Sequence, residues 1–176
     1  MRTRESARGF TLIELMVVVI AVGIMAGFAL DRLLPLVGRA QRVAFLQVEG
    51  QLKSALLLEA ADRITHGESS TLPQLTSVNP MSLLLDPPSN YIGALAWPDP
   101  DKIPGHTWYY DEHGKCLVYR VGKFTRFKAL KGPDNRIEFR VDFAYRDRNG
   151  DGKFEAGRDE FDGLRLVPLY AFDWPD

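Results

Sequence analysis

The chain is organised around Gly9-Phe10-Thr11-Leu12-Ile13-Glu14-Leu15, a short segment that opens an apolar run extending to Leu30. The run from Phe10 to Leu30 holds 21 residues, of which only Thr11 and Glu14 are clearly polar. A helix of that length rises about 30 Å, which matches the hydrocarbon core of a bilayer. The run therefore predicts one membrane-spanning helix near the N-terminus.

The sequence on either side of this run suggests how the span is oriented. Arg2, Arg4 and Arg8 precede the run, and a longer sequence of mixed, globular composition follows it. Basic residues beside a span favour the cytoplasmic side. We therefore expect the N-terminus in the cytoplasm and the rest of the chain across the membrane.

Glu14 does not suit a plain membrane anchor. A lone carboxylate in a membrane segment is costly and marks a functional site by default. Residues 10–30 contain no Lys or Arg that could pair with it. A cut between Gly9 and Phe10 would create an α-amino cation at Phe10, free to pair with Glu14 of a neighbouring copy.

The order Gly9-Phe10-Thr11-Leu12-Ile13-Glu14 resembles the processing site of type IV pilins and type II secretion pseudopilins. The resemblance covers roughly residues 8–30. It implies that a prepilin peptidase cuts after Gly9 and methylates Phe10. It also implies that Glu14 guides the assembly of subunits into a helical filament.

Two plainer interpretations of the N-terminus stay open. One is a secretory signal peptide, with a weak cleavage site at Gly27-Phe28-Ala29, although the apolar run exceeds the usual length of about 7–15 residues. The other is an ordinary single-span anchor, which leaves Glu14 unexplained. Gly23 and Gly27, four residues apart, suit close helix packing in a membrane, a common pattern that is weak evidence alone.

The chain divides into a leader, residues 1–9, a transmembrane and assembly helix, residues 10–38, and a head, residues 39–176. The head begins with an amphipathic helix, residues 39–66, which Gly67 ends. Pilin-like proteins usually have a proline near position 31, so Asp31 and Pro35 are departures, but we expect the helix to continue. Apolar residues recur along one face at steps of three or four: Phe45, Val48, Leu52, Leu56, Ala60 and Ile64.

A variable loop region, residues 67–106, follows the helix. We expect a polar loop over 67–77, a short helix over 81–85 capped by Asn79, and an irregular, proline-rich stretch over 87–106. We expect Tyr91 and Trp97 in this stretch to be core residues.

A sheet region, residues 107–176, completes the head. Strands are expected over 107–110, 115–121, 136–145 and 164–170, with Pro168 arguing that the last lies at an edge. The predicted fold is therefore α+β and pilin-like, a long N-terminal helix packed on a small antiparallel sheet.

The loop between the last two strands resembles the first half of a calcium-binding EF-hand loop. Asp147, Asn149 and Asp151 supply oxygens at alternate positions, and the Lys153 carbonyl would be the next ligand. Arg158 stands where a glutamate would close such a loop, so Asp159 or Glu160 would have to close it. The resemblance to type II secretion major pseudopilins, which carry calcium in this region in place of a disulfide, agrees with a calcium site. The alternative for the loop of this chain is a solvated acidic turn without a bound ion.

Composition excludes several function classes. The net charge is −1, and it becomes −3 once residues 1–9, with three Arg and one Glu, are removed. This balance offers no broad basic surface for nucleic acid, and we read the basic segment from Lys123 to Lys131 as solvated.

Cys116 is the only cysteine, so no intrachain disulfide can form, and we expect a buried thiol. The histidines show no ligand spacing, and no catalytic constellation stands out.

These observations predict a structural role rather than an enzyme. The resemblance implies a pseudopilin of a type II secretion pseudopilus, inserted in the bacterial inner membrane with its head in the periplasm. Its partners would be other pilin-like subunits, the prepilin peptidase, and an assembly platform with its ATPase. The alternatives are a minor type IV pilin for adhesion or motility, or a membrane-tethered periplasmic calcium-binding module or enzyme.

Overall fold

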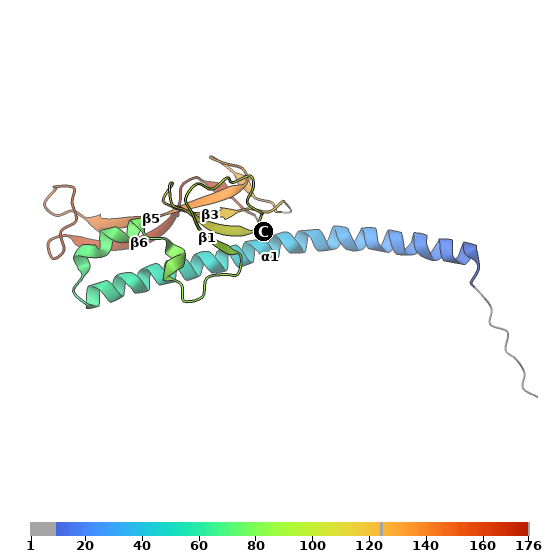
Figure 1. Ribbon diagram of the computed structural model, residues 1–176, viewed down its shortest axis with the longest axis horizontal. Coiled ribbons are helices and arrows are strands. Elements are labelled where there is room, and N and C mark those ends of the chain that lie inside the picture. The colour runs from blue at the N-terminus through green and yellow to red at the C-terminus, as the bar shows by residue number, and fades with distance from the viewer. Residues whose placement is uncertain (1–9, 124, 176) are drawn as a thin grey trace, which may run out of the picture.

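The protein is described from a computed structural model, which covers residues 10–123 and 125–175. Its organising element is helix α1, Leu12–Thr65, which runs without interruption for 54 residues and includes Pro35. Thr11 caps its start, and Gly67, at φ +77°, follows its end in the left-handed conformation typical of a helix stop. Figure 1 shows α1 as one long rod that carries the rest of the chain on its second half.

The two halves of α1 have opposite surroundings. Every residue from 10 to 33 is exposed, although nearly all are apolar. From Phe45 onward one face is buried under the head, at Phe45, Val48, Leu52, Leu56 and Ala60. Ile64 is 44% exposed, so its predicted place on this face is wrong. The last turn of α1 instead meets the head through Arg63, which donates a hydrogen bond to the Thr71 carbonyl.

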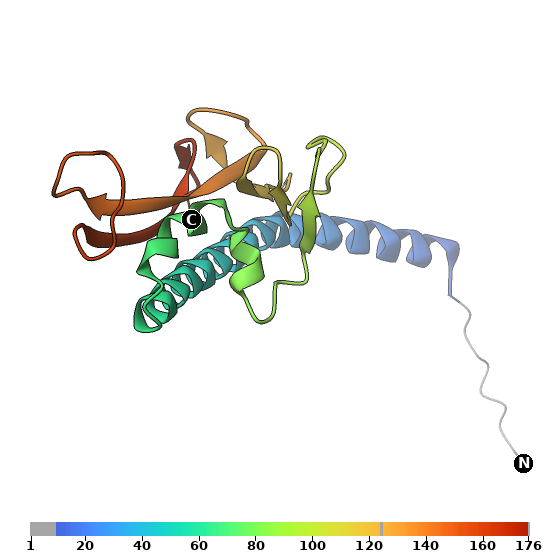
Figure 2. The same ribbon diagram turned by 60° about the vertical axis from the view of Figure 1, so that its left-hand side comes forward.

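The head contains a five-stranded sheet in the order β1-β2-β3-β5-β6. Its strands are β1 (Tyr91–Leu95), β2 (Thr107–Asp111), β3 (Cys116–Arg120), β5 (Arg136–Arg146) and β6 (Glu160–Pro168). The sheet lies across α1, with two 3-10 segments, η1 (Ser69–Ser77) and η2 (Pro80–Leu83), beside the helix (Figure 2). The predicted α+β fold, a long helix packed on a sheet, is confirmed.

One edge of the sheet differs from the prediction. β1 pairs with β2 in parallel, so the sheet is mixed rather than wholly antiparallel. The chain leaving β1 must return to the start of β2, and residues 96–106 make this crossover, which a tight hairpin cannot make. β6 forms the opposite edge, as Pro168 predicted, and begins at Glu160, earlier than expected.

The region between helix and sheet is more ordered than predicted. Residues 69–77, expected as a polar loop, form the 3-10 helix η1 (Ser69–Ser77). Leu72 and Leu75 share a face because three residues complete one 3-10 turn, and both are fully buried with Ala60. The short helix after Asn79 is confirmed as η2 (Pro80–Leu83), and the Asn79 side chain accepts a hydrogen bond from the Met81 N–H.

The two aromatic residues of the proline-rich stretch have different positions. Tyr91 lies in β1 and packs against the main core. Trp97 is 77% exposed, so the prediction that it fills the core is wrong. It lies in the crossover after β1 and contacts the ring of His113, with ring centroids 4.1 Å apart and ring planes tilted by 32°.

The main core joins the first buried turn of α1 to three adjacent strands. Phe45 of α1 contacts the rings of Trp108, Tyr119 and Phe139, which come from β2, β3 and β5. β5 alternates as predicted, with Ile137, Phe139 and Val141 buried. Cys116 is free and buried, as expected, and burial raises the pKa of its thiol to about 11.

A second, two-stranded sheet was not predicted. β4 (Lys128–Ala129) pairs antiparallel with β7 (Phe172–Asp173). Both strands have only two residues, too few for an alternating pattern to reveal them. The small sheet brings Phe127 and Trp174 together at the point where α1 leaves the head.

Candidate functional site

The N-terminal segment combines an exposed phenylalanine with a capped helix start. Phe10 precedes α1 and is 70% exposed, and Gly9 lies outside the described residues. The Glu14 backbone N–H donates to the Thr11 hydroxyl oxygen at 3.2 Å, one half of a capping box. The carboxylate of Glu14 thus belongs to the first turn of α1, where the helix dipole favours a negative charge.

This geometry supplies a second explanation for Glu14. A Thr-x-x-Glu sequence at a helix start is common without any assembly role. Capping explains the spacing of Thr11 and Glu14, but it does not explain why a charged residue is placed in an otherwise apolar surface. The two roles predict different effects of substitution at Thr11 and at Glu14.

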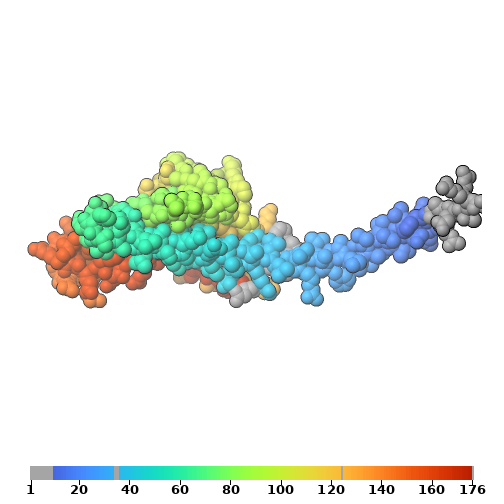
Figure 3. All heavy atoms as spheres, turned by 90° about the horizontal axis from the view of Figure 1, so that it is seen from below, coloured from blue at the N-terminus to red at the C-terminus, as the bar shows by residue number. Residues whose placement is uncertain are grey.

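The first half of α1 projects from the head as a bare apolar rod (Figure 3). An 18-residue window of α1 has a mean hydropathy of 2.5, and none of it is buried in the structure. By length and composition α1 can therefore cross a membrane, a test that an N-terminal signal sequence also passes. Because soluble proteins rarely leave such an apolar surface uncovered, this half requires a membrane or other helices around it.

One family model matches the N-terminal segment of the chain. Residues 4–30 match the prokaryotic N-terminal methylation motif. No curated protein and no solved structure matches the chain. The prepilin-type motif, together with the long helix packed on a sheet, indicates the type IV pilin-like class of proteins. That class typically consists of structural subunits that a prepilin peptidase processes and that assemble with other pilin-like subunits.

The second candidate site is the loop between β5 and β6. Asp147 organises its first half through three backbone N–H groups: Oδ1 accepts from Asn149 and Gly150, and Oδ2 accepts from Gly152 at 2.7 Å. The bond from Gly152 is the main reason that the pKa of Asp147 is lowered. Positive φ angles at Gly150 and Gly152 permit the tight path of the loop.

Three side chains meet inside the loop. The Asn149 amide nitrogen lies 3.1 Å from an Asp151 carboxylate oxygen and 3.2 Å from a Glu155 carboxylate oxygen. Glu155 was missed in the sequence analysis. It is the ninth residue counted from Asp147, a position that often contributes to EF-hand sites, and that count could have identified it.

The far end of the loop is held by Asp159. One of its carboxylate oxygens accepts from the Arg148 N–H at 3.1 Å and the other from the Glu155 N–H at 2.7 Å. Glu160, the alternative closing residue, instead pairs with Arg146 and Arg148. Within the loop, the backbone N–H of Lys153 donates a hydrogen bond to a carboxylate oxygen of Asp151.

The loop thus presents an oxygen-rich donor set whose oxygens are partly engaged by the backbone. Over residues 10–123 and 125–175, no three His, Cys, Asp or Glu side chains are already grouped as metal ligands. A cation would therefore have to displace the Asn149 amide nitrogen, displace the Arg158 guanidinium that pairs with Glu155 at 2.9 Å, and turn the side-chain oxygens inward. The chemistry of these donors suits a hard cation such as calcium.

The histidines occupy separate structural positions. Hydrogen bonding to the Asp62 carbonyl raises the pKa of His66 at the end of α1, as expected of a helix-end cation. His106 has a left-handed backbone, φ 65°, and its ring covers Gly122, where a Cβ atom would clash with it. Burial lowers the pKa of His106. Neither arrangement resembles a catalytic pair.

Proposed function

We propose that this chain is a structural subunit of a type II secretion pseudopilus. It is cut after Gly9, methylated on Phe10 and inserted in the inner membrane through residues 10–38. The observation that carries the proposal is the bare apolar half of α1, which begins at the methylation motif and ends where the head begins. Such a rod can leave the bilayer for a filament only if the helices of other subunits replace the lipid around it.

The orientation of the span rests on the processing motif more than on flanking charge. Arg2, Arg4 and Arg8 precede the span, but Arg32, Arg39 and Arg42 follow it closely. A bias of basic residues toward one side is therefore weak here. The processing site at Gly9 carries the resemblance to pilin-like proteins, whose heads face the periplasm or the filament exterior, and this resemblance favours a periplasmic head.

The acidic loop supports a pseudopilin rather than a pilin. With one cysteine the chain cannot use a disulfide to hold its C-terminal region. We propose that calcium does so, held by Asp147, Asn149, Asp151, the Lys153 carbonyl and Glu155. Asp159, assigned as a ligand from the sequence, would shape the loop through its two backbone bonds. The second candidate function, a minor type IV pilin, is favoured by the same N-terminal motif.

Processing and incorporation test the proposal together. Mass spectrometry of the membrane-extracted chain should find a methylated Phe10 at its N-terminus, and the chain should co-purify with sheared filaments. Gly9→Val should leave an uncut precursor in the membrane that is absent from filaments. A chain that begins at Met1, or one cut after Ala29, would contradict the proposal. Filaments of a secretion system or of a pilus system would decide between the two candidates.

A further inference from the structure

The segment between β3 and β5 is the most basic part of the head. The stretch from Arg120 to Lys131, both included, contains five basic residues and no acidic residue. Lys123, Lys128 and Lys131 are exposed, and none of them takes part in an ion pair among the residues that the structure describes. Two acids lie beside this segment: Asp134 lines the same cavity as Lys123, and Asp173 lies opposite Lys128 in the small sheet.

Tertiary structure places this segment at the end of the head nearest the bare half of α1. Phe127 packs on Phe172 and Trp174, with ring centroids 5.8 Å apart in each pair. Trp174 in turn lies 5.1 Å from Phe45, the first fully buried residue of α1. Arg39 and Arg42 belong to the two turns of α1 just before Phe45. We call Arg39, Arg42, Lys123, Arg126, Lys128 and Lys131 the proximal basic surface.

The distance from this surface to a membrane follows from the length of the helix. Apolar residues continue beyond Leu30 to Val37, interrupted by Asp31, Arg32 and Pro35. The stretch from Phe10 to Val37 would span about 42 Å, equal to a whole bilayer with its headgroup regions. Phe45 then lies about 12 Å beyond the headgroups, about one and a half times the Debye length of about 8 Å at physiological salt. Lysine side chains are long and flexible enough to cover part of this distance.

We propose that the proximal basic surface binds anionic phospholipid headgroups of the leaflet that faces the head. This inference rests on the proposed membrane anchoring and goes beyond it by naming a lipid partner for the head. The exposed Leu130, between Lys128 and Lys131, adds an apolar group of the kind that interfacial surfaces use. The contact would hold the head against the membrane in the inserted subunit, and it would be broken when the subunit leaves the bilayer for a filament.

A lipid suits this surface better than a second copy of the chain. The acidic loop of another subunit, with Asp151 and Glu155, is a possible protein counterpart by charge. The span, however, holds the proximal basic surface within about 12 Å of the headgroups in every inserted molecule, at any protein concentration. The charge of the lipid and the number of copies of the chain in each membrane patch can be varied independently. An experiment can therefore distinguish binding to lipid from binding to a second copy of the chain.

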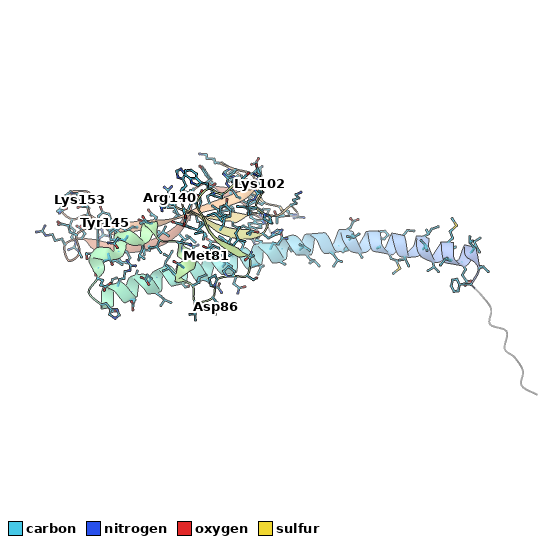
Figure 4. The ribbon with its side chains drawn as sticks, viewed as in Figure 1. Met81, Asp86, Lys102, Arg140, Tyr145 and Lys153 are labelled. Carbon is cyan, nitrogen blue, oxygen red and sulfur yellow. The ribbon has the colours of Figure 1, made fainter. Side chains whose placement is uncertain are left out.

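The test uses the full chain in nanodiscs of phosphatidylcholine, alone or mixed with phosphatidylglycerol, at one copy per disc. A neutral amine-reactive reagent labels lysines, and mass spectrometry gives the rate at each site. Lys153 is the internal control, because it lies at the opposite end of the head (Figure 4). We expect Lys123, Lys128 and Lys131 to react about fivefold more slowly in anionic discs, as expected from the attraction of one basic residue to an anionic surface. The difference should vanish in about 0.5 M salt, where screening is nearly complete.

Charge reversal supplies the matched variants. Lys123→Glu with Lys128→Glu should equalise the labelling of Lys131 in the two kinds of disc, whereas Arg140→Glu, at an exposed position of β5 outside this surface, should leave the slowing unchanged. Equal rates in both discs for the unaltered chain would overturn the inference while leaving the anchor intact. Slowing that follows the number of copies per disc, not lipid charge, would assign the surface to a second copy and also overturn it. Extraction of the chain from both discs by carbonate would instead refute the anchor itself.

Discussion

The rings of Phe45 in α1 and Trp108 in β2 stack with nearly parallel planes, 2° apart, and with centroids 5.5 Å apart. Both side chains are almost completely buried. Phe45 also contacts Tyr119, Phe139, Phe172 and Trp174, so one helical residue joins both sheets to the helix. This contact marks the point where α1 changes from a bare apolar rod to the spine of a folded head.

Truncating Phe45 should therefore destabilise the whole head. Phe45→Ala removes a large buried ring and leaves a cavity, which typically costs about 3–5 kcal/mol of unfolding free energy. Val43→Ala is the matched control, because Val43 is 61% exposed on the same helix and should change stability by less than about 0.5 kcal/mol. Denaturant unfolding of the detergent-solubilised chain, followed by tryptophan fluorescence, measures both. Similar losses in the two variants would show that Phe45 does not join helix and sheet.

Glu14 should matter for assembly rather than for insertion. Glu14→Ala and Glu14→Gln remove a costly charge from the apolar run, so the chain should remain in the membrane fraction. Both should lower incorporation into filaments, because the α-amino group of Phe10 in the adjacent subunit loses its counter-charge.

Thr11→Ala separates the pairing role of Glu14 from its capping role. This variant loses the 3.2 Å cap bond but keeps the carboxylate. If Thr11→Ala assembles normally while the Glu14 variants do not, the charge pairing is supported. An equal defect in all three variants would mean that assembly depends on the integrity of the helix start and not on the charge of Glu14 alone.

The loop at Asp147 should respond to calcium. An ion that binds only the folded state raises the unfolding free energy by about 2.7 kcal/mol when it is present at 100 times its dissociation constant. The chain should therefore melt at a higher temperature in millimolar calcium than in chelator. Magnesium should substitute poorly, since it requires a smaller octahedral arrangement of ligands.

Variants of the loop sharpen this measurement. Asp151→Ala should abolish the effect of calcium, and Glu155→Gln should weaken it. Asp162→Ala, which alters an exposed acid of β6 that follows the loop, should leave it intact. Identical melting curves with calcium and with chelator for the unaltered chain would identify the loop as a solvated acidic turn.

Lowering the pH should reduce the stability of the folded head through protonation of His106. Burial lowers its pKa below the ordinary value of 6.5, and its Nδ1 is buried without a hydrogen-bond partner among the described residues. As pH falls below 6.5, the unfolded chain therefore binds a proton more readily than the folded chain, and stability decreases until the folded-state pKa is passed.

His106→Asn is the comparison for this prediction, because asparagine tolerates the left-handed backbone and does not titrate. The melting temperature should fall less between pH 7 and pH 5 in the variant than in the unaltered chain. The comparison is necessary because His66, whose pKa is raised, contributes in the opposite sense. An unchanged pH dependence in His106→Asn would show that this ring is not the source.

Sequence patterns were most informative where one face or one motif dominates. The period of α1 predicted Phe45, Val48, Leu52, Leu56 and Ala60 as its buried face, and strict alternation predicted β5. Patterns failed in the segments whose burial depends on distant partners. Leu72 and Leu75 are isolated apolar residues in a polar stretch until Ala60 of α1 packs on them. Trp97 is aromatic and borders a strand, but the crossover carries it out into solvent.

The sequence by itself determined the methylation motif, the apolar span, the single cysteine and the acidic loop, because each depends on residues that are neighbours in the chain. Only the tertiary structure decided the parallel edge of the sheet, the pairing of β4 with β7, the place of Glu155 in the loop and the position of the basic segment beside the emerging helix. These features join residues far apart in sequence or depend on the path of the backbone. The packing free energy of many side chains selects such features, and no local pattern encodes them.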